Sequence, residues 1–526
     1  MIEEKATKRG IAMLSRVYTA GLCGIDGFEV LVECSGQDRL PRFEIVGLPD
    51  LAVKEAKERV RAACENSGIY FPSMDLTLNL APADRKKEGS SFDLAILCAI
   101  LQCDGKIPRK LSLADQCFIG ELSLSGEVRP VRGALCLALA ARDAGRHEVF
   151  VPAENAREAS VVEGITVYGV HTLRELLAHL SGQERIQPTV YDRAEFDGRR
   201  GRHPLDFADV RGQFRAKRAM EIAAAGGHNI LLIGPPGSGK SMLAKRLPTI
   251  LPDLTFEEAV ETTKIHSIAG MLQDSLVTER PFRSPHHSVS VPGLVGGGTS
   301  PRPGEISLSH NGVLFLDELP EFNKALTESL RQPLEDGAVS VTRAAARVRY
   351  PASFMLVCAM NPCRCGYYGD PNKTCTCRQD DVQKYLSRVS GPLLDRIDIQ
   401  IELPAVTFSE MSGPGEGGER SSAIRARVNA ARAMARRRAE AAGEVHLFSN
   451  AAMSPSDIRR FCPLDEGARA LLAGAFDELG LSGRGYDRVL RVARTIADLA
   501  GEERIGVPHL AEAIQLRSLD RKYWNR

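Results

Sequence analysis

A glycine-rich loop between an apolar run and a helical pattern constrains the fold of this chain more than any other feature. Residues 230–233 are four consecutive apolar residues, as in a buried strand. The loop that follows consists of Gly234, Pro235, Pro236, Gly237, Ser238, Gly239, Lys240 and Ser241. Because the loop lies between a strand and a helix, the pattern predicts a phosphate-binding loop on a parallel α/β sheet.

Each residue type in this loop has a role in binding a nucleoside triphosphate. Glycines allow backbone N–H groups to turn toward the phosphates, and the helix N-terminus adds positive potential. Lys240 is expected to reach the terminal phosphates, and Ser241 is expected to ligate Mg²⁺. A glycine-rich turn without function is the alternative, and the correct elements on both flanks argue against it.

Three later strand ends carry the residue types that hydrolysis needs. In GVLFLDELPEF, Asp317 is expected to hold Mg²⁺ through water and Glu318 to polarise the attacking water. Solvated turn residues are the alternative, and the upstream loop argues against it. Asn361 ends the apolar run FMLVCAMN, where it can orient that water or sense the γ-phosphate. Arg396 precedes a further strand and can supply charge to a neighbouring subunit's nucleotide, with a surface salt bridge as the alternative.

Length and patterning predict several domains. The chain has 526 residues, too many for one hydrophobic core. Residues 1–180 mix β-rich runs with helical patterns, and 181–207 are polar with Pro and Gly, as in a linker. Residues 208–403 predict the parallel α/β core, with an insertion at 363–377, and residues 404–526 are predominantly helical. The fold class is therefore multidomain α/β.

Composition limits the location and the partners. With 43% hydrophobic and 26% charged residues, the chain is typical of globular proteins. The net charge of +1 means that any nucleic-acid binding must come from local basic patches. No apolar run is long enough for a signal peptide or a membrane span, so a cytoplasmic location without membrane contact is expected. The thirteen cysteines are then not a disulfide framework.

Four of the cysteines form two C-x-C pairs in NPCRCGYYGDPNKTCTCR. The two arms can bring four thiolates around one ion, although C-x-C is tighter than the usual zinc spacing. Such a site has no open coordination position, so a structural zinc is expected rather than a catalytic metal. Free thiols and a disulfide pair are the alternatives. The predicted ligands are Cys363, Cys365, Cys375 and Cys377.

Taken together, these motifs resemble an AAA+ ATPase. The stretches FRSPHHSVSVPGLVGGGTSPRPGEISLSHNGVLFLDELPEF, LRQPLEDGAVSVTRA and SGPLLDRIDI are similar to the magnesium-chelatase-like branch, specifically the bacterial YifB/ComM family. The resemblance implies a homohexameric ring with ATP between subunits and a C-terminal helical lid. It gives the Walker A, Walker B and sensor-1 roles to Lys240, Ser241, Asp317, Glu318 and Asn361, the arginine finger to Arg396 and the second sensor to Arg484, with Arg488 and Arg491 as neighbouring candidates.

The N-terminal domain resembles the Lon-protease-like domain of this family through KKEGSSFDLAILCAIL and IGELSLSGEVRPVRGALCLALAARDAG. Lon peptidases activate a serine with a lysine. Ser91 lies near the serine position, but Leu137 stands where the lysine would be. Because a serine without its base is a weak nucleophile, peptidase activity is not expected and a scaffold or DNA-contact role is left.

The resemblance also predicts two insertions that project toward the ring pore, SVPGLVGGGTSPRPGE and LEDGAVSVTRA. The histidines 286 and 287 precede the first, and Arg343 and Arg347 lie in or after the second, where basic and polar groups can track a phosphodiester backbone. An ATP-driven motor acting on DNA, of the helicase or branch-migration kind associated with ComM in natural transformation, is therefore expected. A chelatase-like remodeller of a protein partner is the alternative. The arginine-rich stretch 424–443 is either a DNA-contact helix or a solvated helix surface.

Overall fold

The computed structural model describes residues 13–199, 201, 203–298, 301–343, 346–405, 418–444, 449–479 and 481–524. The chain forms two compact units. The first unit consists of Met1–Asp197 with Ala259–Val277, and the second consists of Gly198–Glu258 with Thr278–Arg526. The segment 259–277 thus belongs to the first unit, whereas the sequence analysis placed it in the predicted α/β core.

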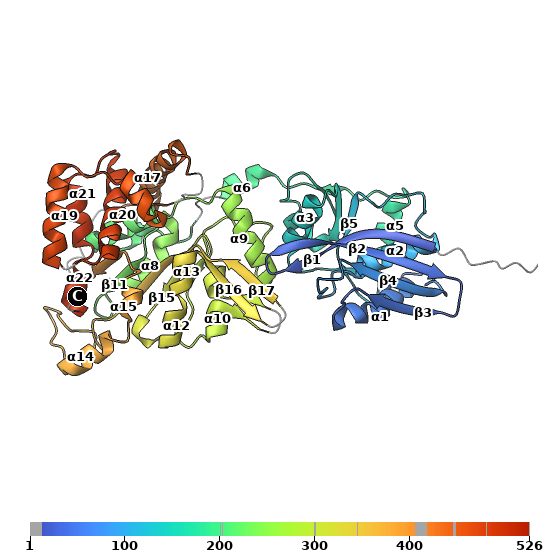
Figure 1. Cartoon of the computed structure of the whole chain (residues 1–526), viewed down its shortest axis with the longest axis horizontal. Helices are drawn as coiled ribbons and strands as arrows, with labels where there is room; N and C mark the ends of the chain where they lie inside the picture. The colour runs from blue at the N-terminus through green and yellow to red at the C-terminus, as the bar shows by residue number, and fades with distance from the viewer. Residues whose placement is uncertain are drawn as a thin grey trace, which may run out of the picture. The chain divides into compact units, whose positions relative to one another are not determined.

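The first unit is built on one eight-stranded mixed sheet (Figure 1). The long strands pair antiparallel at its centre, and their alternately buried residues give the sheet a packed face. The strand order is β10 (Pro188–Thr189), β9 (Thr166–Val170), β8 (Glu148–Pro152), β5 (Gln116–Phe118), β1 (Met13–Cys23), β2 (Asp26–Gln37), β4 (Asp75–Ala81) and β3 (Arg42–Val46), with β6 (Glu121–Leu122) and β7 (Val128–Arg129) as a separate ribbon.

Helices of the first unit pack on this sheet. Helix α1 begins after Asp50, whose carboxylate accepts a 2.8 Å hydrogen bond from the backbone N–H of Val53, a cap typically worth about 1 kcal/mol. Its apolar residues Val53, Ala56, Val60 and Ala63 are buried against the unit. The helices are α1 (Leu51–Asn66), α2 (Asp93–Asp104), α3 (Ala134–Asp143), α4 (Ala156–Ala159), α5 (Leu173–Leu180) and α6 (Arg193–Arg199).

Two segments differ from the sequence-based expectation. The predicted linker 181–207 contains β10 and α6, and Phe196 of α6 is fully buried. A single buried aromatic ring gives no periodic signal, so the pattern did not indicate this helix. The helix α9 (Phe256–Ala269) joins the first unit because the buried carboxylate of Glu158 accepts hydrogen bonds from the Leu135 N–H and the Ser267 hydroxyl.

The second unit contains the predicted parallel sheet. Its strand order is β12 (Phe282–Arg283), β15 (Val313–Leu316), β18 (Met355–Met360), β11 (Ile230–Ile233) and β19 (Ile399–Glu402), and all neighbouring pairs are parallel. The three central strands are completely buried, which fits their continuous apolar sequences. Shorter helices follow the strands: α8 (Lys240–Arg246), α11 (Glu305–Leu308), α12 (Lys324–Ser329), α13 (Arg331–Asp336), α14 (Gln379–Leu386) and α15 (Gly391–Leu394).

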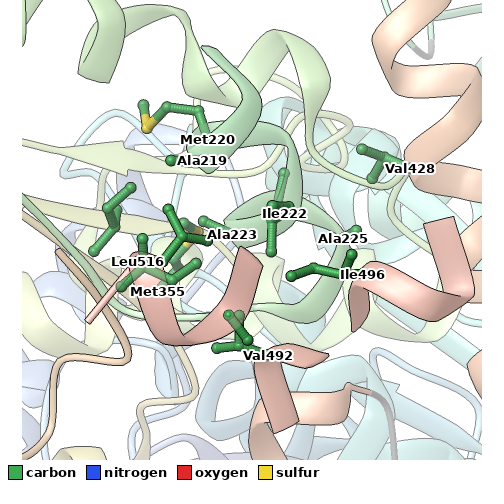
Figure 2. Close-up of a cluster of buried hydrophobic side chains, with 14 of the residues drawn as sticks. Ala219, Met220, Ile222, Ala223, Ala225, Met355, Val428, Val492, Ile496 and Leu516 are labelled. Carbon is green, nitrogen blue, oxygen red and sulfur yellow. The ribbon is translucent and has the colours of Figure 1, made fainter. Parts of the chain in front are cut away.

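The alanine-rich helix α7 (Phe214–Gly226) packs against both the sheet and the C-terminal helices. Figure 2 shows Ala219, Ile222 and Ala223 of α7 in one cluster with Met355 of β18 and with side chains of the C-terminal helices. Burial of a Val or Ile side chain in such a cluster contributes about 1.5–3 kcal/mol. The C-terminal helices are α17 (Ser421–Ala441), α18 (Pro455–Phe461), α19 (Glu466–Leu479), α20 (Gly483–Ala500), α21 (Val507–Gln515) and α22 (Leu519–Trp524).

The two predicted insertions form small elements of the second unit. The first contains α10 (Val291–Val295) and the short ribbon of β13 (Gly296–Gly297) and β14 (Arg302–Pro303). The second is the antiparallel hairpin of β16 (Ala338–Arg343) and β17 (Ala346–Pro351). They contact one another, since the Tyr350 hydroxyl donates a 2.7 Å hydrogen bond to the Pro301 carbonyl. Among the helices of the described residues, none is long and apolar enough to cross a membrane.

Candidate functional site

The glycine-rich loop connects the carboxyl end of β11 to α8, as the sequence predicts. Gly237 and Gly239 adopt φ values of 79° and 91°, a left-handed conformation that glycine accepts without strain. Gly234 has no room for a side chain, because a Cβ atom there would lie 2.5 Å from the Leu403 carbonyl oxygen. The loop is therefore held closely against the chain that leaves β19.

The lysine of the loop is enclosed by the groups expected to work with it. The Lys240 ammonium donates hydrogen bonds to the carbonyl oxygens of Gly234 at 2.8 Å and Pro235 at 2.9 Å, and to Oδ1 of Asn361 at 3.1 Å. Burial lowers the pKa of Lys240, and the nearby Asp317 carboxylate opposes that effect. The structure thus brings the loop and Asn361 together at the carboxyl edge of the sheet.

The two expected magnesium ligands are also in contact. The Ser241 hydroxyl donates a 2.7 Å hydrogen bond to Oδ2 of Asp317. Hydroxyl and carboxylate oxygens are the hard donors that Mg²⁺ prefers, so Ser241 and Asp317 fit this ion and would hold it, directly or through water, beside the phosphates. The ion supplies charge neutralisation to phosphoryl transfer when bound.

The second acid of the pair has an unusual backbone. Glu318 has a φ of 54°, in the left-handed region, and its side chain is exposed. A non-glycine residue in this region costs of order 1–3 kcal/mol, and such strain persists where the surrounding structure enforces it, often at functional sites. Its backbone N–H donates a 3.0 Å hydrogen bond to Oδ1 of Asp317. The strained turn directs the Glu318 carboxylate away from the buried strand toward solvent, as activation of a water molecule requires.

Arg396 lies at the opposite edge of the same sheet. The carbonyl of Asn229, just before β11, accepts hydrogen bonds from the N–H groups of Asp398 and Ile399, and the Asn229 amide donates one to the Arg396 carbonyl. Arg396 is therefore at the amino ends of the strands. Since a four-residue strand spans about 13 Å, the chain's own loop at the carboxyl ends is out of reach. Sequence reasoning did not identify Asn229. The only signal for it is that it is a polar residue directly before a buried strand.

A cavity of about 520 Å³ at this amino edge gathers the other candidate arginines. Arg396 is buried, donates a 2.7 Å hydrogen bond to the Pro392 carbonyl and is ion-paired with the half-exposed Glu335. The salt bridge that was the alternative role for Arg396 is therefore present. Among the described residues, however, the Nε atom of Arg396 has no hydrogen-bond partner. The arginines that line the cavity are Arg396, Arg484, Arg488 and Arg491.

The cavity arginines that lie on α20 differ in their burial and in their partners. Arg488 is buried and ion-paired with Asp398 at 3.3 Å, and burial lowers its pKa to about 10. Arg484 lies one turn earlier, is exposed and lines the same cavity. Arg488 thus anchors α20 to the sheet, whereas the exposed Arg484 can contact a molecule outside the chain. Arg491 is half-buried and also lines the cavity. The lining also contains Glu335, Asp398 and Asp487, and two of these acids pair with Arg396 and Arg488.

The four cysteines lie in one cluster, as predicted. Their sulfur atoms are all within 4.8 Å of one another, and the Cys363 sulfur is 3.3 Å from Cys365 and 3.7 Å from Cys375. A tetrahedral zinc with bonds of about 2.3 Å separates its sulfur ligands by about 3.8 Å. A disulfide needs about 2.05 Å, so the separations match the thiolate ligands of a metal rather than a disulfide.

Local hydrogen bonds favour the charged form of at least one thiol. Burial acts to raise the pKa of Cys365, but the backbone N–H groups of Tyr367 and Thr376 point at its sulfur and bring the pKa well below the usual range. Zinc binds the thiolate form, so this environment suits a metal ligand. Cys363 is fully buried and the other three cysteines are partly exposed, which describes a closed site near the surface.

The arginine-rich helix α17 is largely accounted for by internal ion pairs. Arg427 pairs with Glu221 and Glu419, and Arg438 forms two hydrogen bonds with the buried Asp498 at 2.6 and 2.8 Å. These contacts fix α17 to α7 and α20. The structure therefore favours a packing role for α17 over the DNA-contact role considered from its sequence.

In the first unit, the positions that correspond to the Lon serine and lysine differ in environment. Leu137 is fully buried on α3, and Ser91 is partly exposed with its carbonyl accepting a 2.9 Å hydrogen bond from the Gly120 N–H. The leucine side chain has no basic group that could deprotonate a serine hydroxyl. The residues present do not form a serine–lysine pair.

Comparisons with known proteins cover almost the whole chain. Family models described as magnesium chelatase subunit ChlI match residues 206–411 and 32–155, and the ChlI C-terminal model matches 418–517. The competence protein ComM of Haemophilus influenzae is 43% identical over 514 residues, covering 97% of this chain and 98% of ComM. The uncharacterized protein YifB of Escherichia coli is 42% identical over 513 residues, with the same coverage of both chains. A Lon protease of Erwinia amylovora is 28% identical over 135 residues, 24% of this chain and 17% of the protease.

Proposed function

Because this chain belongs to the magnesium-chelatase-like AAA+ family of ComM and YifB, which implies ATPase activity, we propose that it is an ATP-driven ring motor that acts on DNA in the cytoplasm. The proposed activity is of the helicase or branch-migration type, with a role like that of a competence protein. The observation that carries it is the similarity to ComM over 97% of the chain, which includes the nucleotide site and both insertions.

The positions of the arginines support a ring in which each ATP lies between two subunits. The P-loop and Glu318 are at the carboxyl edge of the sheet, whereas Arg396 and Arg484 line a cavity at the amino edge. Head-to-tail stacking of subunits brings one chain's amino edge to the next chain's carboxyl edge, and such heterologous contacts close into rings. Hydrolysis in one subunit then depends on the arginines of its neighbour.

DNA contact is proposed for the two insertions that meet at Tyr350. Arg302 on β14 and Arg349 on β17, the sequence neighbours of the bonded residues Pro301 and Tyr350, are both exposed. His286, which precedes the first insertion, is also exposed, and its ring lies 4.0 Å from that of His287. Cationic side chains on projecting loops neutralise backbone phosphates without reading sequence, as a translocating motor requires. The side chains of Arg343 and Arg347, which the sequence also indicated, lie outside the described residues.

Strand separation tests the proposal. Purified protein with ATP and Mg²⁺ is expected to unwind a forked duplex or to migrate a four-way junction, and Lys240→Ala is expected to do neither. Reversing the charge of the insertions with Arg302→Glu and Arg349→Glu should weaken this activity more at low salt than at high salt, because salt already screens the phosphate contacts that the variant loses. Failure of the wild-type protein on every DNA substrate, together with capture of a defined protein substrate, would instead support a chelatase-like remodeller.

We also propose that the cysteine cluster holds a structural zinc ion. Reductively purified protein is expected to contain about one zinc per chain, because four thiolates complete its coordination. Cys377→Ser removes one ligand and should lower the zinc content strongly, whereas Cys23→Ser, at an exposed cysteine far from the cluster in sequence, should not. Elemental analysis by mass spectrometry measures both. Less than about half an equivalent in the wild-type protein would contradict the proposal.

A further inference from the structure

We propose that the cysteine segment, Cys363–Cys377, is a working part of the nucleotide site: with its metal bound it holds Pro236 of the P-loop in the conformation that binds nucleotide, so that metal occupancy controls nucleotide affinity. The inference deepens the proposed function and rests on the proposed zinc site for its metal-dependent part. Its other part, the contact with the P-loop, rests on packing alone.

The cysteine segment touches the P-loop directly. Gly366 has a φ of 87°, and a Cβ atom at this position would lie 2.4 Å from Cδ and 2.8 Å from Cγ of Pro236. Real Cβ atoms do not approach other atoms so closely, so the backbone of the cysteine segment is pressed against the proline ring. Only glycine satisfies both the left-handed conformation and this approach. Pro236 is otherwise exposed, so Gly366 provides a direct packing contact for this ring.

The turn that contains Gly366 also contains the proposed metal ligands Cys363 and Cys365, and it follows Asn361 in the chain. The Gly366 N–H donates a 3.0 Å hydrogen bond to the carbonyl of Cys363, which closes a tight turn between the first two cysteines. Asn361, just upstream, accepts from the Lys240 ammonium at 3.1 Å. A displacement of Cys363 therefore reaches the P-loop by two routes, through the Gly366 contact and through Asn361.

Helix α22 lies near the far side of the segment and is bonded to the sheet. A Cβ atom at Gly369 would have only the Lys522 side chain within reach, at 4.0 Å, and Lys522 forms a 2.6 Å ion pair with Glu402. The Tyr523 hydroxyl also donates to Glu402 at 2.7 Å. Glu402 is paired in register with Ile233, the residue immediately before the P-loop. The cysteine segment thus lies between the P-loop and helix α22.

A metal ion is what can keep this segment rigid. Its two C-x-C arms are separated by a stretch with two left-handed glycines, Gly366 and Gly369, and by exposed residues from 371 to 374. Without an ion, the two arms are joined through weak contacts of the thiols, such as those of Cys375 with Cys363 and Cys365. Loss of the ion should therefore release the Gly366 turn from Pro236. The P-loop would then adopt its nucleotide-binding conformation only part of the time, and the affinity for nucleotide would fall in proportion to that fraction.

Two glycines of the same segment provide a matched pair of variants. Gly366→Ala introduces a methyl group into the Pro236 ring, whereas Gly369→Ala introduces one where only a flexible lysine end lies nearby. Both positions have left-handed φ values, 87° and 78°, so the backbone cost is similar. Gly366→Ala is expected to weaken binding of a fluorescent ADP analogue about tenfold, equal to about 1.4 kcal/mol, and Gly369→Ala less than about twofold. The full-length protein is used, with zinc content measured in each variant.

A double variant and a zinc-removal experiment test the contact and the metal dependence separately. Pro236→Ala removes the two ring atoms that meet the added methyl group, so the double variant Gly366→Ala/Pro236→Ala should bind no more weakly than Pro236→Ala alone. Removal of zinc from the wild-type protein with a chelator should weaken binding by a similar factor, and added zinc should restore it. Gly366→Ala with wild-type affinity would overturn the contact. Unchanged affinity after complete zinc removal would overturn metal control, and a wild-type protein without zinc would overturn the zinc proposal separately.

Discussion

Replacing Glu318 by glutamine is expected to abolish ATP turnover while ATP binding is retained. The carboxylate is exposed at the end of β15, beside the Ser241–Asp317 pair, and is the group proposed to activate water. General-base catalysis contributes typically about 10²–10⁴-fold, so kcat should fall by that factor. Glutamine preserves the size of the side chain and leaves Lys240 and the loop untouched, so the Kd for ATP should change little. Phosphate release and equilibrium nucleotide binding measure the two quantities.

Glu321 is the matched control for this variant. It lies on the turn that follows Glu318, is exposed and is ion-paired with Arg388 at 3.2 Å. An exposed ion pair of this kind is worth about 0–1 kcal/mol, so Glu321→Gln should leave turnover nearly unchanged. If Glu318→Gln hydrolyses ATP as fast as Glu321→Gln, another residue activates the water and the assignment is wrong.

Arg396→Ala is expected to lower ATP turnover by about 10³-fold in the assembled ring without loss of nucleotide binding. The expectation follows from geometry, because Arg396 is at the amino edge of the sheet and the chain's own P-loop is at the carboxyl edge. An arginine contributed by the next subunit stabilises transition-state charge but is not needed for binding. Arg388→Ala, which removes an arginine of the same unit that is paired with Glu321, is the control.

Mixing two inactive variants tests whether Arg396 acts across a subunit boundary. Arg396→Ala chains keep an intact P-loop, and Lys240→Ala chains keep Arg396. In rings assembled from equal amounts, half of the P-loops are intact and half of the neighbours supply the arginine, so about a quarter of the sites (one half times one half) should be complete. Recovery of activity on mixing supports action in trans. No recovery in mixed rings of demonstrated composition would place the role of Arg396 within its own chain.

Much of the second unit could be predicted from its sequence because its determinants are local. The strand, loop and helix around Lys240 are contiguous, and Asp317 and Asn361 each follow a fully apolar strand that is found in the structure. Parallel strands bring their carboxyl ends to one edge, so residues far apart in sequence were expected to meet there. The contact of Lys240 with Asn361 is the result.

The remaining features depend on contacts between distant segments. Nothing in the periodicity of 259–277 indicates that Ser267 bonds to Glu158 of the first unit. The cysteine spacing predicts a cluster but not that Gly366 presses on Pro236. The charges on α17 allowed either a DNA-contact helix or a solvated surface, and only the structure shows their carboxylate partners on other elements. Packing decides which residues meet across long sequence separations. A local sequence pattern does not contain that information.

The stimulation of ATP hydrolysis by DNA tests the central claim most directly. Steady-state turnover is measured for the wild-type protein without DNA, with single-stranded DNA and with forked DNA, at one salt concentration, with Glu318→Gln as the hydrolysis-deficient control. A DNA motor predicts turnover that rises several-fold with DNA, most with the forked substrate, and a flat response in Glu318→Gln. Wild-type turnover that is substantial but identical with and without every DNA would contradict the account.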